Sequence, residues 1–248
     1  MTTRASLSGF SRLPGIAIPA IPYITRCGAY TVMIFHDSKD MISFRLADIN
    51  DLEEISALCA DAFLDYDFYR PFVADPVKRL KFVYDLHVQC FKAEIRRKQA
   101  VVGIEDGKIV TAFALHDPES RQPGLWEYLT SGALSMIFRY GFAPISWFSM
   151  YDKCSAPVTR FNKEHQDVYY VEVLAVRQDK QRQGIGSRAI HEYMVPFVRS
   201  SGGGFISLIT NSEENTLFYE ANGFKCFDHK KVPAAKEEIG NWCFSMNV

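Results

Sequence analysis

The stretch that decides the fold is VYYVEVLAVRQDKQRQGIGSR, residues 168–188. Residues 168–176 are mainly β-branched, aromatic and aliphatic, which predicts a buried strand. A polar turn over 177–180 follows, and a helical pattern begins after the glycine-rich residues 181–186. Glycine lets a ligand approach the backbone closely, and the first N–H groups of a helix have no partner inside it. The stretch therefore predicts a strand, a turn and a helix start that together can cradle a phosphate or pyrophosphate.

The composition of the whole chain is typical of a soluble globular protein. The 248 residues are 48% hydrophobic and 23% charged, and the formal net charge is −1. This balance gives no electrostatic reason to expect a nucleic acid or an anionic membrane as a partner. The six cysteines form no CxxC or Cys/His cluster, and the six histidines form no HxH or HExxH pattern. We therefore expect no metal site, no disulfide framework and a cytoplasmic location.

The N-terminal residues 1–40 differ from the rest of the chain. Up to His36 they contain three arginines and no acidic residue, with frequent Ser, Thr and Pro. Arginine and serine without acids fit an organelle transit peptide, whereas the prolines disfavour its amphipathic helix. We favour a flexible extension, or a segment upstream of a true start at Met33 or Met41. The folded domain is expected over 41–248.

Hydrophobic periodicity predicts the elements before the central stretch. A strand is expected near 42–46, helices over 51–63 and 76–98, and a β-hairpin over 100–115. Residues 117–166 form a long connection that is rich in Trp, Tyr, Phe and Met. We expect at least one helix in this aromatic-rich insertion, acting as extra core, as a pocket wall or as both. Charged residues and a proline interrupt its apolar run, so it predicts no membrane span.

The elements after the central stretch complete an alternating pattern. A helix follows the glycine turn, and Pro196 should kink or shorten it. A strand over 205–209 comes next, and then a helix whose buried side is expected to be Leu217, Phe218 and Ala221. Two further strands are expected near 225–232 and 241–246. The order predicts the α/β class, with a mixed central sheet flanked by helices.

With these elements in place, residues 41–248 resemble the GNAT superfamily of acyl-CoA-dependent N-acetyltransferases. The family's Q/R-x-x-G-x-G/A loop stands here as QRQGIG at 181–186, after a strand that ends in LAV at 174–176. Its F-Y-x-x-x-G-F signature stands as FYEANGF at 218–224. The two motifs occur in the family's order, and each follows a predicted strand.

The resemblance implies a set of cofactor-binding and catalytic residues. The backbone of Leu174, Ala175 and Val176 would bond the pantetheine arm of acetyl-CoA like an added strand. Tyr219 would protonate the departing CoA thiolate. Asn215 would contact the pantetheine region, and Asn211 competes with it for that role. The pyrophosphate would be held by the turn Arg182, Gln183, Gly184, Ile185, Gly186 and Ser187.

The central strand also offers a candidate general base. Glu172 is the only carboxylate inside the strand, and the two-residue period places it on one face with Tyr170 and Leu174. An ammonium nucleophile must lose a proton, which Glu172 can accept, through water. The alternatives are a structural carboxylate or a substrate-binding group. Asp65 and Asp67 either lie at an ordinary solvated helix end or attract a cationic amine.

These residues lead to a main hypothesis and two alternatives. The main hypothesis is acetyl transfer from acetyl-CoA to the primary amine of a small molecule, without a metal. The first alternative is a protein lysine or N-terminal acetyltransferase, which an open groove beside the central strand would favour. The second is a non-catalytic sensor that binds acyl-CoA. The chain is expected to be a monomer or a homodimer.

Overall fold

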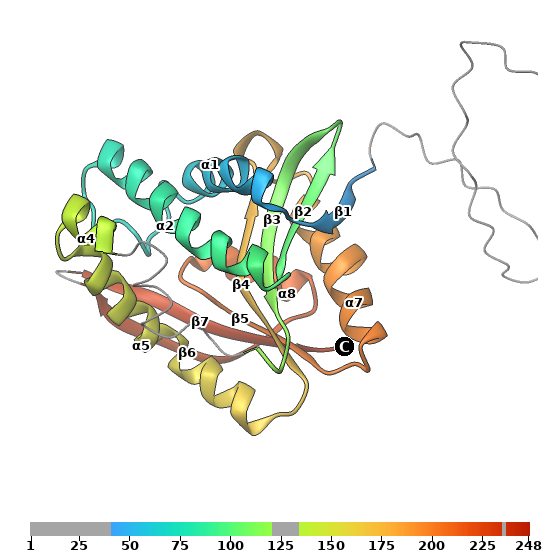
Figure 1. Cartoon of the computed structure of the whole chain (residues 1–248). Coiled ribbons are helices and arrows are strands. Elements are labelled where there is room, and N and C mark those ends of the chain that lie inside the picture. The colour runs from blue at the N-terminus through green and yellow to red at the C-terminus, as the bar shows by residue number, and fades with distance from the viewer. Residues whose placement is uncertain (1–40, 121–133, 235–236) are drawn as a thin grey trace, which may run out of the picture. The chain divides into compact units, whose positions relative to one another are not determined.

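One mixed sheet organises the domain, with seven strands among the residues described, in the order β1-β2-β3-β4-β5-β7-β6 (Figure 1). The computed structural model describes residues 41–120, 134–234 and 237–248, and the predicted extension 1–40 lies outside them. Strands β4 and β5 pair in parallel, and the other neighbours pair antiparallel. The mixed sheet confirms the predicted fold class. The strands are β1 (Ser43–Leu46), β2 (Ala100–Glu105), β3 (Lys108–His116), β4 (Val168–Val176), β5 (Phe205–Thr210), β6 (Lys225–Ala234) and β7 (Glu237–Asn247).

Helices cover both faces of the sheet. On one face, α1 (Leu52–Ala62) and α2 (Pro76–Arg96) pack on β2, β3 and β4, as predicted from their periodicity. On the other face lie α6 (Ile185–Arg188), the π-helix η5 (Ala189–Met194) and α7 (Val195–Ser200). The remaining elements are α4 (Leu134–Tyr140), α5 (Ala143–Glu164), α8 (Glu213–Ala221) and the short 3-10 turns η2 (Ile49–Asp51) and η4 (Gln178–Lys180). Helices α4 and α5 confirm that the insertion contains at least one helix.

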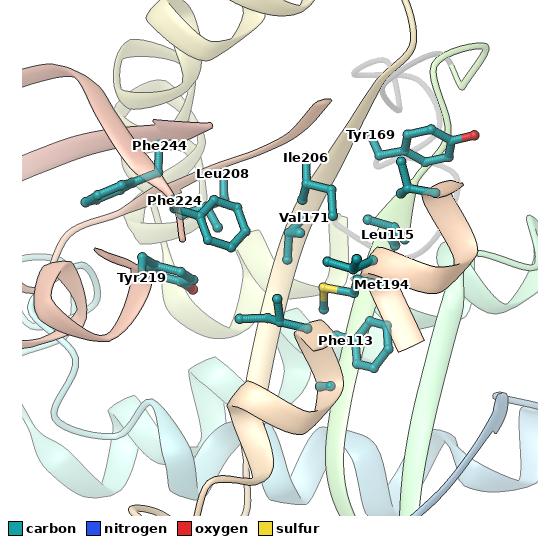
Figure 2. Packing of buried hydrophobic residues seen from close by; sticks show 14 of the residues in the cluster. Phe113, Leu115, Tyr169, Val171, Met194, Ile206, Leu208, Tyr219, Phe224 and Phe244 are labelled. Carbon is teal, nitrogen blue, oxygen red and sulfur yellow. The ribbon is translucent and has the colours of Figure 1, made fainter. Parts of the chain in front are cut away.

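The main core lies between the sheet and the segment from η5 to α7. Side chains from β3, β4, β5 and β7 meet Met194 of the π-helix, and Tyr219 and Phe224 close the cluster at its other end (Figure 2). Most members of the cluster are almost completely buried. This packing fixes where β4 ends and α6 begins, which is the region that carries the predicted cofactor motif.

Pro196 does not shorten the helix that contains it, so the prediction of a shorter helix is wrong. The chain stays helical from Ile185 to Ser200, and the turn before Pro196 widens into the π-helix η5. Such a local widening accommodates a residue that has no N–H to donate. Ala189, Met194 and Val198 are fully buried, so the helix stays against the sheet.

The predicted buried side of α8 is also wrong. Leu217 is 69% exposed and Ala221 is exposed, whereas Tyr219 is buried and Phe218 is partly buried. The helix packs through its C-terminal end, because Gly223 takes a φ of +93° and turns Phe224 back into the core. The buried side of α8 is therefore formed by the signature residues themselves.

Strand β4 carries a bulge and then leaves its parallel neighbour. Ala114 of β3 pairs with Val173 and Leu115 pairs with Val171, so Glu172 has no partner in the register. Because of the bulge, residues that simple alternation would place on one face of the strand lie on opposite faces. Val173 packs against the core under α1 and α2, while Leu174 packs against the core on the opposite face. The prediction that Glu172 shares a face with Leu174 is wrong for this reason.

Candidate active site

A groove of about 580 Å³ runs along the end of β4, and we call it the outer groove. Pairing between β4 and β5 stops at Val171, so the last part of β4 has no strand on that side. The groove is bordered by the end of β4, the turn into α6, the start of α8, and the end of α1 with the segment after it. Every predicted cofactor residue except Gln183 lines it.

The turn before α6 presents backbone N–H groups to the outer groove. Arg182 has a φ of +61° and Gly184 a φ of +79°, so two positions of the turn are left-handed. In the described part of the chain, no hydrogen bond uses the backbone N–H groups of residues 182–187. These N–H groups open the run of helical residues that extends to Ser200, where the helix dipole favours an anion. The Arg182 side chain is exposed and has no ion-pair partner among the described residues.

Gly186 brings the turn close to α8. A Cβ at this position would lie 2.9 Å from Cζ of Phe218 and 3.8 Å from Cγ2 of Val176. The contact with Phe218 is shorter than carbon atoms tolerate, so a side chain would push the two elements apart. The two sequence motifs therefore touch each other, and the second glycine of the turn is the residue that allows it.

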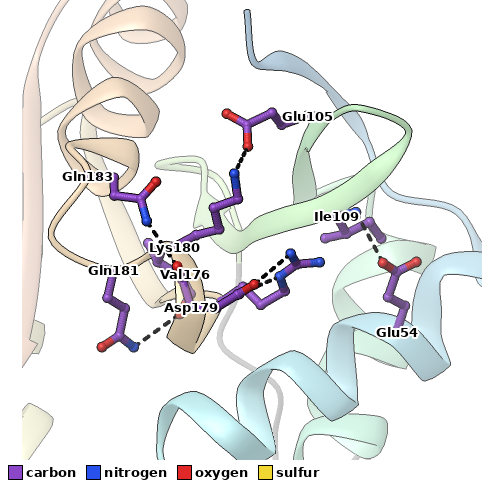
Figure 3. Close-up of polar contacts among 9 residues, drawn as sticks. Glu54, Glu105, Ile109, Val176, Asp179, Lys180, Gln181 and Gln183 are labelled. Atoms are coloured by element: carbon purple, nitrogen blue, oxygen red, sulfur yellow. Dashed lines mark hydrogen bonds and ion pairs between the residues drawn. The ribbon is translucent and has the colours of Figure 1, made fainter. Parts of the chain in front are cut away.

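Side chains on both flanks hold the turn in place (Figure 3). Lys180 forms an ion pair with Glu105 at the tip of the β2–β3 hairpin. Gln183 donates from Nε2 to the Asp179 carbonyl at 2.9 Å, and Gln181 donates from Nε2 to the Val176 carbonyl at 3.1 Å. Gln183 thus supports the turn from outside the groove. The turn is preorganised, because these contacts exist in the protein alone.

The register of β4 decides which of its backbone groups face the groove. The Arg177 N–H donates to the Val110 carbonyl of β3 at 2.9 Å. By the alternation of an antiparallel pair, the polar groups of Ala175 also point to β3, and those of Leu174 and Val176 point away from it. The Gln181 amide on the Val176 carbonyl agrees with this direction. The edge that Leu174 and Val176 offer is therefore available to an extended ligand.

A second cavity of about 110 Å³, the inner pocket, opens beside the groove. Its walls come from α2, α5, β4, β5, α8 and the segment after α1, and aromatic side chains dominate them. Trp147 and Tyr151 of the predicted insertion belong both to the core and to this wall. Five residues line both cavities and define their junction: Phe63, Tyr66, Leu174, Asn215 and Tyr219.

Tyr219 lies at the junction of the two cavities, where aromatic rings surround it. Its ring packs against Phe218, Phe224 and Phe244. Burial raises the pKa of the Tyr219 phenol, so the hydroxyl keeps its proton across the neutral range. Tyr66 lies at the same junction, where its hydroxyl accepts a bond from the Asn211 N–H at 2.7 Å. Tyr66 was not predicted from the sequence, although the acidic and aromatic segment around it stood out.

The two competing asparagines have different surroundings. Asn215 lines both cavities, and its side-chain amide donates to Thr210 Oγ1 at 3.3 Å. Asn211 lines only the inner pocket, and its amide donates to the Gly240 carbonyl at 2.9 Å and to Asn241 Oδ1 at 3.1 Å. Because its amide N–H groups are already used by β7, Asn211 is the weaker candidate for contacting a ligand in the groove.

Glu172 lies in the wall of the inner pocket, where the β4 bulge directs it. Its Oε2 accepts a hydrogen bond from the Tyr151 hydroxyl at 2.7 Å, and Tyr151 also contacts the Tyr170 hydroxyl at 3.1 Å. Burial raises the pKa of Glu172, while His116 and the Tyr151 bond act in the opposite direction. A carboxylate with a raised pKa in a small cavity is a suitable proton acceptor.

Asp65 and Asp67 lie at the mouth of the outer groove rather than in the inner pocket. Asp67 forms an exposed ion pair with Arg70 at 2.6 Å. Asp65 is 86% exposed and meets Arg79 at 3.3 Å. Both carboxylates are thus paired with arginines, which favours the interpretation as a solvated helix end.

The described residues were also inspected for metal-binding clusters and for helices that could span a membrane. In the described ranges, no group of three or more His, Cys, Asp and Glu side chains could hold a metal ion. None of the helices in the described ranges has the length and the apolar character that crossing a membrane requires.

Solved structures with the same architecture were found by structural comparison. The C-terminal condensation domain of Ebony in complex with beta-alanyl-dopamine aligns with a TM-score of 0.63 and 11% identity, over 84% of this chain and 99% of that one. The Drosophila melanogaster polyamine N-acetyltransferase gives a TM-score of 0.54 and 13% identity, over 84% and 100%. The PaiA N-acetyltransferase of Thermoplasma acidophilum, in complex with coenzyme A, gives 0.50 and 11%, over 84% and 99%.

Comparison of the sequence itself gave no match, either to models of known protein families or to curated proteins. The structural likeness extends over 84% of this chain, although the identities lie below 15%. The chain therefore has the fold of the GNAT N-acetyltransferases.

Proposed function

We propose that this chain is an N-acetyltransferase that transfers the acetyl group of acetyl-CoA to the primary amine of a small molecule. One observation carries the proposal. An outer groove with free N–H groups meets a closed aromatic pocket with a carboxylate, and Tyr219 stands where they join. The groove suits a long anionic cosubstrate, and the pocket suits a small acceptor. No metal is required for this chemistry.

The cosubstrate would lie along the outer groove. Its pyrophosphate would accept hydrogen bonds from the N–H groups of the turn Arg182, Gln183, Gly184, Ile185, Gly186 and Ser187, with the Arg182 charge nearby. The pantetheine arm would pair with the outward backbone groups of Leu174 and Val176, with Ala175 between them. Asn215 would contact the arm near the thioester. Pairing at Val176 requires the Gln181 amide to leave the carbonyl that it now contacts.

The reaction then follows from the groups at the junction. The neutral amine attacks the thioester carbonyl carbon from the inner pocket, and its proton passes to Glu172 through water. Backbone N–H groups of β4 stabilise the oxyanion of the tetrahedral intermediate. The carbon–sulfur bond breaks, and Tyr219 donates its proton to the CoA thiolate. The products are the acetamide and CoA, and the proton on Glu172 passes through water to the Tyr219 phenolate, which restores both groups.

The inner pocket favours a small molecule over a protein acceptor. Its volume of about 110 Å³ suits a small acceptor better than a polypeptide segment. The structural neighbours include enzymes named for agmatine, arylalkylamines and polyamines, which are small amines. A non-catalytic sensor would need neither Glu172 in the inner pocket nor Tyr219 at the junction. Free cysteines and a net charge of −1 agree with a cytoplasmic protein that binds neither nucleic acid nor membrane.

The test combines binding with turnover. Titration calorimetry should detect acetyl-CoA binding to the full chain, and a thiol reagent should detect CoA release when amines are added. Gly184→Pro removes the N–H and the left-handed conformation of the turn, so it should weaken acetyl-CoA binding. Gly202→Pro, at another left-handed glycine outside the groove, is the matched control. Equal acetyl-CoA affinity of the native chain and Gly184→Pro would refute the proposed cosubstrate site.

A further inference from the structure

The residues that line the inner pocket indicate the kind of acceptor that fits it, which the fold alone does not. Its walls contain rings in layers: Trp147 stacks on Tyr69 at 6.0 Å between centroids and on Tyr151 at 5.6 Å, with Phe68 against its edge at 5.5 Å. Leu86 and Ile209 complete the apolar part of the wall. This surface offers ring faces and edges, which aromatic guests pack against well.

The charges around the pocket, like its shape, restrict which acceptors can bind. Among the described residues that line it, Glu172 is the only carboxylate, and none is a lysine or an arginine. His87 adds no charge, because burial lowers its pKa to about 4 and its Nδ1 meets the Val83 carbonyl at 2.8 Å. His116 lies behind the wall and is already paired with Glu94. A carboxylate on the acceptor would therefore be buried without an unpaired cation lining the pocket, which is costly.

A second ammonium on the acceptor meets the same difficulty. The other carboxylates nearby do not line the inner pocket: Glu94 bonds His116 at 3.0 Å, and Asp61, Asp65, Asp67 and Glu214 line the outer groove. One buried carboxylate can compensate one ammonium. The pocket is also only about a fifth of the volume of the outer groove, which favours a small acceptor.

From these observations we infer that the acceptor is a small aromatic monoamine: one ring, a short aliphatic linker, a single primary amine and no carboxylate. This inference rests on the proposed acetyl transfer and names its substrate class. The amine nitrogen lies at the junction beside Tyr219 and Glu172, and the ring lies among Tyr69, Trp147 and Tyr151. Because ring contacts and charge alone select this acceptor, its binding can be tested without turnover.

The first experiment measures kcat/KM for matched amines with the full chain and acetyl-CoA. 2-Phenylethylamine is compared with phenylalanine, which adds a carboxylate, with 1,4-diaminobutane, which adds a second ammonium, and with hexylamine, which lacks the ring. We expect 2-phenylethylamine to exceed each of the others by about tenfold or more, since a single missing or uncompensated contact changes kcat/KM by that order. A preference for the diamine or for phenylalanine overturns the inference, while acetyl transfer as such would stand.

The second experiment separates this inference from the proposed function. Calorimetry of the chain saturated with CoA measures binding of 2-phenylethylamine and of 1,4-diaminobutane without any reaction. If no amine is acetylated but 2-phenylethylamine binds at least tenfold more tightly, the transfer proposal fails and the pocket assignment holds. Equal binding of the two amines refutes the assignment.

A variant pair locates the effect. Trp147→Leu should lower kcat/KM for 2-phenylethylamine by about tenfold and leave the KM for acetyl-CoA nearly unchanged, because Trp147 lines only the inner pocket. Trp242→Leu is the matched control, since that indole stacks on His229 away from both cavities. Unchanged discrimination by a folded Trp147→Leu chain contradicts the inference, and if the variant does not fold, the calorimetry of the native chain decides.

Discussion

His116 at the end of β3 donates a hydrogen bond from Nε2 to Oε2 of Glu94 on α2, at 3.0 Å, with both side chains almost completely buried. Burial alone lowers the pKa of His116. The bond to Glu94 and the negative charges of Glu172 and Glu94 outweigh burial, so the pKa is raised overall. The imidazolium in turn lowers the pKa of Glu172, which burial raises. Glu94 and His116 therefore set the charge environment of the proposed base.

Replacing His116 by glutamine should move the acidic limb of the kcat/KM profile to higher pH. Glu172 must be deprotonated to accept a proton, and the loss of the imidazolium raises its pKa further. The other groups that act on Glu172 remain in place: Tyr151, Tyr170, Glu94, Tyr69 and Cys90. The measurement is the pH dependence of CoA release.

His191→Gln is the matched control, because that imidazole meets Asn222 Oδ1 at 3.1 Å and lines neither cavity. It should leave the limb where it is in the native chain. A limb that stays in place in His116→Gln, or that moves to lower pH, would mean that His116 does not act on the proposed base.

Tyr219→Phe should lower kcat by about 100-fold or more, which is the usual contribution of a general acid. The KM for acetyl-CoA should change little, because the ring and its contacts remain. Steady-state CoA release at saturating acetyl-CoA measures both constants. Tyr193→Phe is the control, since Tyr193 packs on Phe44, Phe113 and Phe197 outside the cavities. Full activity of Tyr219→Phe would remove Tyr219 from the mechanism.

Local sequence patterns were sufficient for the elements that build the groove. The β-branched run at 168–176, the glycines at 184 and 186, and the Asp106-Gly107 turn each fix a backbone conformation within a few residues. The bulge at Glu172 could not be predicted, because it depends on the register with β3 and not on the strand's own residues. The prediction that Pro196 would shorten its helix failed for a similar reason, because tertiary packing maintains the π-helix before it.

The inner pocket could be predicted only in part. Its residues come from α2, α5, β4, β5, α8 and the segment after α1, most of which are far apart in the sequence. The aromatic insertion indicated a pocket wall, and Trp147 and Tyr151 provide it. The Glu94–His116 pair joins α2 to β3 across 22 positions, and neither residue lies in a motif. Such pairs become visible only when the fold brings their elements together.

Gly186→Ala should lower the free energy of unfolding by about 1–3 kcal/mol, the usual cost of overpacking. The new Cβ would lie 2.9 Å from the ring tip of Phe218, whose ring packs on Tyr219 at 5.1 Å between centroids. The same displacement should raise the KM for acetyl-CoA, because it widens the groove. Urea denaturation and steady-state kinetics measure the two effects.

A second substitution tests whether Phe218 is the cause. Gly186→Ala with Phe218→Leu shortens the opposing side chain and should recover most of the loss, relative to Phe218→Leu alone. A double-mutant cycle with no coupling between the two positions would mean that the glycine is needed for another reason, such as ligand contact.

Arg79→Met should destabilise the chain and distort the inner pocket. The buried guanidinium donates to the carbonyls of Leu64, Val73 and Ala74 at 2.6, 3.1 and 3.0 Å, so it holds the ends of the segment that carries Tyr66 and Tyr69. Losing these bonds should cost about 3 kcal/mol, because hydrogen bonds from a charged group are strong and the carbonyls stay buried. Urea denaturation measures the loss, and the KM for the amine should rise more than that for acetyl-CoA.

Arg70→Met, which removes only an exposed ion pair with Asp67, should change the stability by less than about 0.5 kcal/mol. Equal losses in the two variants would show that the buried arginine does not hold this segment.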